Sequence, residues 1–221
     1  MFIPEFLGEI NWVIFSKAAL SLFAVFNPFY VLPMFGGLVD DCNEKEQQFL
    51  FRTSALVAAS IVMVMGVIGQ VLVTVVFQVQ IGSMLIAGGI LLFVVALRNM
   101  VVGTTEEEKS VQQASDFSDQ RRGQLLSRAV SPMAFPILVG PGSIITAILI
   151  VNEIGIAQGL LAMLVACTSM VMVMNYGHIL MRKAGRIAPV VISRILMIFL
   201  AALGIDFVQR GVVELFPALK G

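Results

Sequence analysis

The residues with the clearest chemical potential lie in one apolar stretch, Ser131 to Ser143, which reads SPMAFPILVGPGS. It holds three prolines, and a proline lacks the backbone N–H that an intact helix needs. The carbonyls of Pro132 and Ile137 therefore lose their partners four residues on, at Pro136 and Pro141. In hydrocarbon an unpaired carbonyl is costly, so a break survives only where protein, water or a ligand satisfies the backbone. The stretch therefore predicts a binding site, whereas a single proline would more simply indicate a packed kink.

Two glycines and a hydroxyl surround the last proline of this stretch. Gly140 and Gly142 are expected to allow backbone turns closed to other residues, and to leave N–H groups exposed at the start of the next half-helix. Such a helix start favours a carboxylate, because its free N–H groups and the helix dipole both attract negative charge. Ser143 and Thr146 could add hydroxyl donors, although such hydroxyls in membrane helices often bond the carbonyl four residues earlier.

A second break is predicted in the first apolar segment, at Asn27 and Pro28, with Pro33 following. The Asn27 side chain can donate and accept hydrogen bonds, so it suits the amino or carboxylate group of a ligand. Capping the freed carbonyl of a neighbouring turn is an equally good role for it. The candidate substrate-binding residues are Asn27, Pro28, Pro33, Pro136, Gly140, Pro141, Gly142 and Ser143.

One acidic residue, Asp206, is expected deep within the last apolar helix, about 18 Å along it from Arg194 at 1.5 Å per residue. An isolated carboxylate in a bilayer is costly, so Asp206 should be paired or protonated. Arg210 lies one turn further on and predicts a local ion pair. Lys17 is a second candidate partner from across the bundle. The alternative role for Asp206 is ion coupling, with a proton as the ion.

Composition places these residues in a membrane protein. The 221 residues are 58% hydrophobic and only 13% charged, and the mean hydropathy is +0.96, unlike a soluble domain. A formal net charge of zero gives no basic surface for nucleic acid. Cys42 and Cys167 predict neither a disulfide nor a thiolate metal site. The sequence has no hydrolase or phosphate-loop motif, so neither an enzyme nor a cofactor is expected. The expected partners are the lipid bilayer and a small-molecule substrate, and homo-oligomerisation is left open.

The chain is expected to be all α, with six membrane-spanning helices and short loops. Residues 40–48 are expected to form a loop, and the polar segment 98–128 to be mobile in its middle. The expected units are a first three-helix repeat over residues 1–100, a cytoplasmic linker over 101–127 and a second three-helix repeat over 128–221. The expected helices run over residues 10–33 with the break at Asn27, 50–77, 83–97, a broken fourth helix ending near 151, 156–180 and 190–213.

Orientation follows from the side on which basic residues gather. The segments after helices 1, 3 and 5 hold 11 of the 14 lysines and arginines. The positive-inside rule therefore predicts a multi-pass protein with the linker in the cytoplasm and both termini on the outer side of the membrane.

The two halves of the chain show a faint internal repeat. A shift of 108 residues lays Pro28 and Pro33 over Pro136 and Pro141, so both halves share the same proline spacing. Repeats of three helices must have opposite orientations in the membrane. Two inverted repeats with breaks in helices 1 and 4 are typical of secondary transporters. A duplicated scaffold that transports nothing is the alternative.

Four sequence features together resemble the MarC family of six-helix bacterial inner-membrane proteins. They are Asn27-Pro28 with Pro33, Pro136 with Gly140-Pro141-Gly142, Ala87-Gly88-Gly89, and Arg194-Ile195. The resemblance implies a transporter of small neutral amino acids, with proton coupling proposed for some members. Asp206 stands where the family commonly has Gln and Met197 where Gly is usual, so selectivity or coupling is expected to differ.

The expected function is a secondary transporter or exporter of a small neutral amino acid or similar metabolite, with proton coupling as an added possibility. The alternative is a non-transporting integral membrane scaffold or stress-associated protein.

Overall fold

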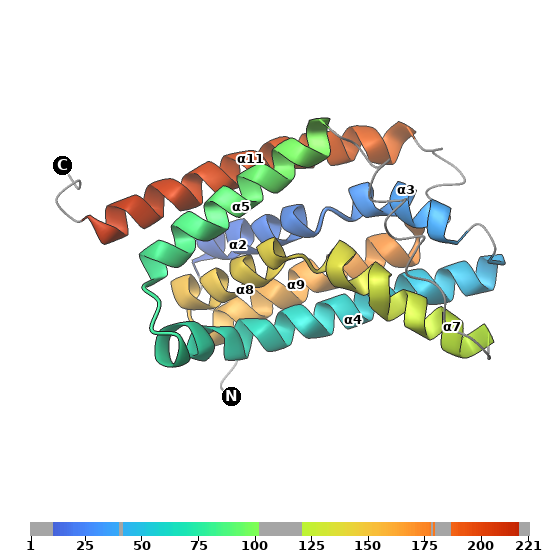
Figure 1. The fold of residues 1–221 in the computed structure, drawn as a ribbon, viewed down its shortest axis with the longest axis horizontal. Coiled ribbons are helices and arrows are strands. Elements are labelled where there is room, and N and C mark those ends of the chain that lie inside the picture. Colours follow the sequence, from blue (N-terminus) through green and yellow to red (C-terminus); the bar gives the residue numbers. More distant parts are fainter. Residues whose placement is uncertain (1–10, 40–41, 102–120, 178, 180–186, 217–221) are drawn as a thin grey trace.

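The computed structural model describes residues 11–39, 42–101, 121–177, 179 and 187–216. Throughout those residues the chain is helical, without strands (Figure 1). The helices are α2 (Trp12–Phe26), α3 (Pro28–Leu38), α4 (Glu44–Val71), the π-helix η1 (Leu72–Val76), α5 (Ile81–Val101), α7 (Arg121–Arg128), the π-type segment η2 (Ala129–Leu138), α8 (Pro141–Ile154), α9 (Ile156–Asn175) and α11 (Ile187–Leu215).

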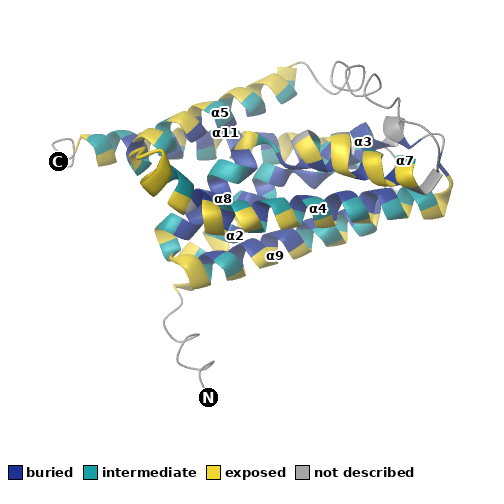
Figure 2. Ribbon diagram, turned by 60° about the horizontal axis from the view of Figure 1, so that its bottom comes forward, coloured by how far each residue is buried: buried dark blue, intermediate teal, exposed yellow. Residues whose placement is uncertain are grey.

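Several helices are long and apolar enough to cross a bilayer. Within the described ranges there are 5 such stretches: Trp12–Phe35, Glu44–Gly69, Ile81–Val101, Ile156–Asn175 and Ala188–Leu215. Large apolar side chains lie exposed on the outside of the molecule, as expected for a surface that faces lipid (Figure 2). The predicted all-helical, multi-pass fold is therefore confirmed. The apolar helix α8 has 14 residues, or about 21 Å, which is shorter than a bilayer core.

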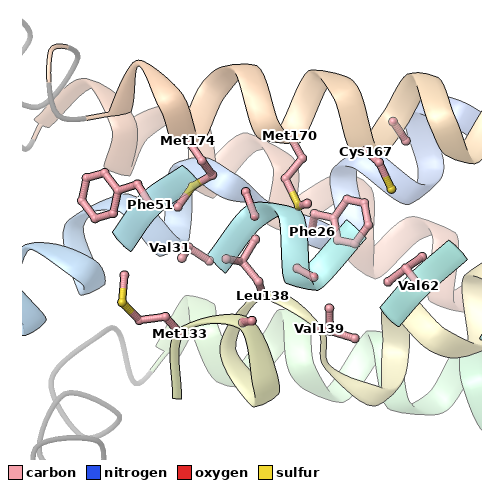
Figure 3. Packing of buried hydrophobic residues seen from close by; sticks show 14 of the residues in the cluster. Phe26, Val31, Phe51, Val62, Met133, Leu138, Val139, Cys167, Met170 and Met174 are labelled. Carbon is pink, nitrogen blue, oxygen red and sulfur yellow. The ribbon is translucent and has the colours of Figure 1, made fainter. Parts of the chain in front are cut away.

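Buried side chains form two separate clusters. The larger cluster joins α2, α3, α4, η2, α8 and α9, which we call the bundle, and Figure 3 shows part of it around Phe26, Leu138 and Met170. The smaller cluster joins α5 and α11, which we call the arm, to Leu149 of α8. The arm helices run side by side along one edge of the molecule (Figure 1). The two packed units meet along α2, α3 and α8.

The two helices of the arm touch through glycines. A Cβ atom added at Gly204 would lie 2.6 Å from the carbonyl oxygen of Gly89, and one added at Gly211 would lie 2.5 Å from that of Gly82. In a membrane, helices associate through close packing rather than the hydrophobic effect, so small residues let the backbones meet. Gly89 and Gly204 therefore allow the close approach of α5 and α11, whereas a Cβ added at Gly88 would lie 2.5 Å from Cγ2 of Ile145 on α8.

Two segments expected to be loop are helical instead. α4 begins at Glu44, inside the predicted loop, because Asn43 and Glu46 form a reciprocal capping box with two N–H···O bonds of 3.0 Å. Such a box satisfies free N–H groups at a helix start. Residues 121–128 of the predicted linker form α7, which packs on η2 and α4. The predicted mobile middle of the linker lies outside the described residues.

The molecule has two ends, which we call the linker end and the termini end. The linker end carries Val101 and Arg121, on either side of residues 102–120, and the termini end carries Trp12 and Leu215 (Figure 1).

Candidate functional site

The first helix breaks at Asn27, as predicted. Asn27 has φ 40° and ψ 60°, the left-handed conformation, and its N–H still bonds the Phe23 carbonyl at 3.1 Å. Asn is one of the few residues that adopts this conformation readily, so it ends α2 as a C-cap. Pro28 then opens α3 at the first helical position, where no N–H is needed. The expectation that Pro33 belongs to the break is wrong, because α3 continues through Pro33 to Leu38.

The second break spans η2 and the start of α8. Ser131 (φ −135°, ψ 121°) and Phe135 (φ −129°, ψ 127°) are extended, and Gly140 is extended at φ −87° and ψ 171°. Each of these residues precedes a proline, whose ring disfavours the helical conformation at the residue before it. The three prolines therefore set the path of the backbone.

This geometry corrects the expectation that Gly140 and Gly142 adopt backbone turns closed to other residues. Gly140 is extended and Gly142 is helical, and neither has the positive φ that only glycine adopts easily. Gly142 instead permits close packing. A Cβ added there would lie 2.6 Å from Cδ2 of Leu92 on α5.

A cavity of about 500 Å³ lies between the two breaks and the arm. Five of the predicted site residues line it: Asn27, Gly140, Pro141, Gly142 and Ser143. Pro28 and Pro33 do not line it, and the side chain of Pro136 lies outside the described part of the chain. The two breaks, 113 positions apart between Asn27 and Gly140, thus meet at one cavity.

Sequence reasoning missed the residues of the arm and α3 that complete the wall. These are Tyr30, Val31 and Met34 on α3, Leu92, Val95, Arg98 and Asn99 on α5, and Met197 and Leu200 on α11. The α5 positions recur every three or four residues, so they share one helix face. This spacing on α5, beside Gly88 and Gly89, is the sequence signal that could have identified these wall residues. Met197, noted above as a departure from the family pattern, lies in this wall.

Asn27 makes one polar contact and lacks another. It is 3% exposed, and its Nδ2 donates to the carbonyl of Ser193 on α11 at 3.4 Å. Because a carbonyl only accepts, the amide nitrogen must face Ser193, which leaves Oδ1 on the other side. Among the described residues no donor reaches this buried Oδ1. The side chain therefore bridges bundle and arm and retains an unused acceptor.

The two hydroxyls beside the break bond locally. The Ser143 Oγ donates to the Gly140 carbonyl at 2.8 Å, and the Thr146 Oγ1 donates to the Gly142 carbonyl at 2.8 Å. Both hydroxyl oxygens remain acceptors, and the N–H of Gly142 stands at the start of α8, where a helix leaves its first N–H groups without internal partners.

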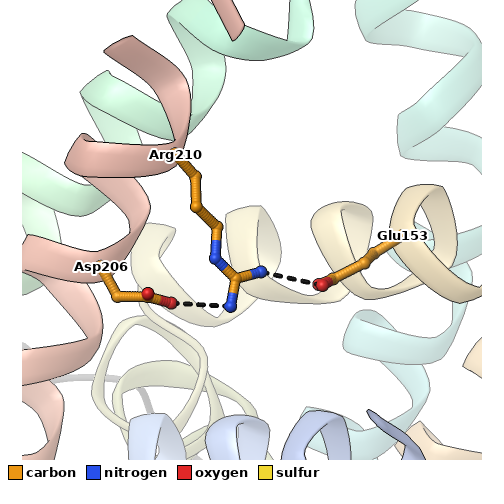
Figure 4. A network of polar contacts seen from close by, with 3 residues as sticks. All are labelled: Glu153, Asp206 and Arg210. Carbon is orange, nitrogen blue, oxygen red and sulfur yellow. Dashed lines mark hydrogen bonds and ion pairs between the residues drawn. The ribbon is translucent and has the colours of Figure 1, made fainter. Parts of the chain in front are cut away.

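Asp206 forms the ion pair that its spacing predicts. Nη2 of Arg210 lies 2.8 Å from Oδ2 of Asp206, and Nη1 of the same side chain lies 2.8 Å from Oε1 of Glu153 on α8 (Figure 4). Lys17 lines the same small pocket as these residues. Asp206 does not line the large cavity. No group of three or more His, Cys, Asp or Glu side chains in the described ranges could hold a metal ion.

Known proteins resemble this chain over almost its whole length. The model of the MarC family, described as integral membrane proteins, matches residues 12–216. Similar relatives include UPF0056 membrane proteins of Aquifex aeolicus, 30% identical over 208 residues (92% of this chain, 94% of the relative), and of Archaeoglobus fulgidus, 29% identical over 204 residues (90% and 92%). The UPF0056 membrane protein YhcE of Escherichia coli is 28% identical over 213 residues (95% and 96%). No solved structure matches. Because the match spans both broken helices and the arm, this multi-pass integral membrane protein belongs to the MarC family.

Proposed function

We propose that this protein is a secondary transporter or exporter of a small neutral amino acid or similar metabolite, which binds in the cavity between the two broken helices. The observation that carries the proposal is the buried Oδ1 of Asn27, for which no partner exists among the described residues. Leaving a buried acceptor unsatisfied costs about 1–3 kcal/mol. A substrate ammonium group in the cavity would provide the missing donor.

The opposite wall suits the other end of a zwitterion. α8 begins at Pro141, and the N–H of Gly142 and the dipole of α8 favour a carboxylate there. Phe26, Met34 and Leu200 offer apolar surface for an uncharged side chain. A cavity of apolar walls with a few placed polar groups is the usual form of a small-molecule site.

Six membrane crossings in two inverted repeats are part of the proposal, with η2 and α8 together making the fourth crossing. The packing supports an inverted repeat, because several helix contacts recur when the halves are exchanged. With α2 matched to η2 and α3 to α8, α2 packs on α9 as η2 packs on α4, and α3 packs on α11 as α8 packs on α5. Broken helices at corresponding positions are where such transporters bind substrate.

We also propose the orientation predicted above, with the linker end in the cytoplasm and both termini on the periplasmic side of the inner membrane. The support is the distribution of lysine and arginine along the sequence.

Ion coupling through Asp206 is a separate part of the proposal. Its carboxylate is held by Arg210, so protonation would weaken that pair. Asp206→Asn should retain exchange of substrate and lose dependence on a proton gradient. A variant that transports with unchanged proton dependence would remove Asp206 from the mechanism, and loss of folded protein would leave only its structural role.

The transport proposal is tested by counterflow of radiolabelled neutral amino acids into liposomes that contain the purified protein. Asn27→Gly should abolish counterflow, because glycine keeps the left-handed backbone and removes the amide. Gln78→Gly is the matched control, since Gln78 also has a positive φ, of 51°, and does not line the cavity. If no amino acid moves with or without a proton gradient, the scaffold alternative is favoured. Equal counterflow by Asn27→Gly and the native protein would contradict the site.

A further inference from the structure

A second cluster of polar side chains lies on the path from the cavity to the termini end. Glu153 of α8, Asp206 and Arg210 of α11 and Lys17 of α2 line one small pocket of about 30 Å³. Arg210 bridges the two carboxylates at 2.8 Å each (Figure 4). The Arg210–Glu153 pair joins the arm to the bundle. None of these four side chains lines the large cavity, so binding there gives the cluster no role.

The same three helices line the large cavity and the small pocket in succession. On α8, Gly142 and Ser143 line the cavity, and Thr146 and Glu153 line the pocket. These positions recur at helical spacing, so they form one continuous face of the helix.

The other two helices show the same order. On α11, Leu200 lines the cavity and Leu203 the pocket, and on α2, Val25 lines the cavity and Ser21 the pocket. The large cavity and the small pocket therefore follow one another along α2, α8 and α11.

The cavity and the pocket differ in size. Toward the linker end the cavity of about 500 Å³ extends as far as Arg98, which is exposed. Toward the termini end the pocket of about 30 Å³ is too small for an amino acid. Among the described residues, this conformation is therefore open toward the linker end and closed at the termini end.

The geometry points to the Glu153–Arg210–Asp206 cluster as the gate that closes the termini end of the translocation passage. The Glu153–Arg210 pair must separate before substrate passes, because it spans the passage from α8 to α11. The inference rests on the proposed transport function and adds its closing element.

The pair is well suited to opening. The side chains of Arg210, Asp206 and Glu153 are 34%, 39% and 53% exposed, so water solvates both partners when they part. Exposed ion pairs contribute little to stability. Lys17 also lines the pocket, so two cations balance two carboxylates there. The closed state is therefore expected to be favoured by this pair only a few-fold.

The gate is tested by labelling, which needs no substrate. A Ser143→Cys reporter in the cavity, in a Cys42→Ser/Cys167→Ala background, is treated with a small cationic methanethiosulfonate in sealed vesicles of each orientation. The reporter should react from the linker-end side and be protected from the termini-end side. Adding Glu153→Gln should raise the labelling rate from the termini-end side about two- to five-fold, the factor expected from losing an exposed pair.

Matched variants separate the gate from a general loss of charge. Glu214→Gln removes a carboxylate one turn beyond Arg210 on α11 and should leave labelling unchanged, because Glu214 does not line the small pocket. Arg210→Gln should raise the labelling rate at least as much as Glu153→Gln, because it also breaks the pair with Asp206. The double variant should not exceed Arg210→Gln, since that change already breaks the Glu153 pair.

The outcomes distinguish the gate from transport itself. No rise with Glu153→Gln, an equal rise with Glu214→Gln, or additive effects in the double variant would each overturn the gate. A protein that shows the expected labelling but moves no amino acid would sink the transport proposal and leave the gated passage standing.

Discussion

Asn27 combines two features that a helix normally avoids. Its backbone is left-handed at φ 40°, and its buried Oδ1 has no partner among the described residues. Strained backbone and unsatisfied polar atoms persist where the surrounding structure holds them, and they gather at functional sites. At this one position the chain both breaks the first helix and presents an acceptor to the cavity.

Substitutions at Asn27 should reverse the usual order of helix stability. Asn27→Gly should be more stable than Asn27→Ala by about 1 kcal/mol, because alanine in the left-handed region costs roughly 1–2 kcal/mol. Thermal unfolding of the purified variants in detergent measures the difference. At Ser60, exposed in the middle of α4, alanine should instead be more stable than glycine. The same order at both positions would contradict the strained break.

Gly142 should be intolerant of a methyl group because of Leu92. The new Cβ would lie 2.6 Å from Cδ2 of a side chain that is 1% exposed, so Gly142→Ala should cost about 1–3 kcal/mol by overpacking. Gly142→Val should in addition abolish ligand binding. Combining Gly142→Ala with Leu92→Ala should cost less than the sum of the single changes, since the second change makes room for the first.

A glycine in open space provides the comparison for Gly142. A Cβ at Gly123 in α7 would meet nothing within 4 Å, so Gly123→Ala should leave stability unchanged or raise it.

The free energy of unfolding of the Gly142→Ala/Leu92→Ala double variant is measured by chemical unfolding. If the losses of the two single variants add up in the double variant, the two residues do not compete for space.

The arm depends on helix contacts that side chains cannot adjust. Gly89 and Gly204 face each other's backbone across α5 and α11. Gly66 of the bundle instead faces a side chain: a Cβ there would lie 2.5 Å from the terminal methyl of Met163. Methionine is unbranched and flexible, so it can move aside. The glycines of the arm therefore set the distance between its helices more strictly than Gly66 does in the bundle.

A methyl group should accordingly be far more disruptive in the arm. Gly204→Ala should destabilise the protein by at least about 1–3 kcal/mol and loosen the contact of α5 with α11. Gly66→Ala should cost less than about 1 kcal/mol of stability. Core changes that a protein tolerates cost about 1.5 kcal/mol or less. Thermal unfolding with proteolysis of the detergent-solubilised variants compares them. Equal losses would show that the arm is as adjustable as the bundle.

Most of the described helices form a six-segment bundle and a two-helix arm, with the cavity at their boundary. Asn27, Gly142 and Ser143 come from the bundle, and Leu92 and Met197 from the arm. A ligand between two packed units is exposed or enclosed when one unit moves against the other, as in rocking transporters. The Asn27–Ser193 hydrogen bond and the Arg210–Glu153 ion pair cross the same boundary.

The proposed orientation can be tested at described, exposed positions. In a background without Cys42 and Cys167, Ser127→Cys at the linker end should be protected from an impermeant thiol reagent in intact cells. Phe216→Cys at the termini end should be labelled, because the positive-inside rule places that end in the periplasm. Labelling of Ser127→Cys as strong as that of Phe216→Cys would overturn the orientation.

Much of the architecture was readable from local sequence. The helical, multi-pass fold follows from apolar segments of spanning length, since every buried backbone group in a bilayer must bond within its own helix. The breaks at Asn27 and near Pro141 follow from proline and asparagine chemistry, which acts within one or two residues. The ion pair of Asp206 with Arg210 follows from their spacing of four on one helix. The start of α4 is also encoded locally, in the capping box of Asn43 and Glu46, although the polar composition around it favours a loop.

Other features arise only when distant segments meet. Glu153 of α8 pairs with Arg210 of α11, and Leu92 of α5 packs on Gly142 of α8. Apolar helices of similar composition do not specify which faces will touch, because in lipid their association depends on shape at each contact. The sequence by itself thus determined the helices, their breaks and the pairs along one helix. The packing of the arm on the bundle decided which of those residues share a cavity and which close the passage beyond it.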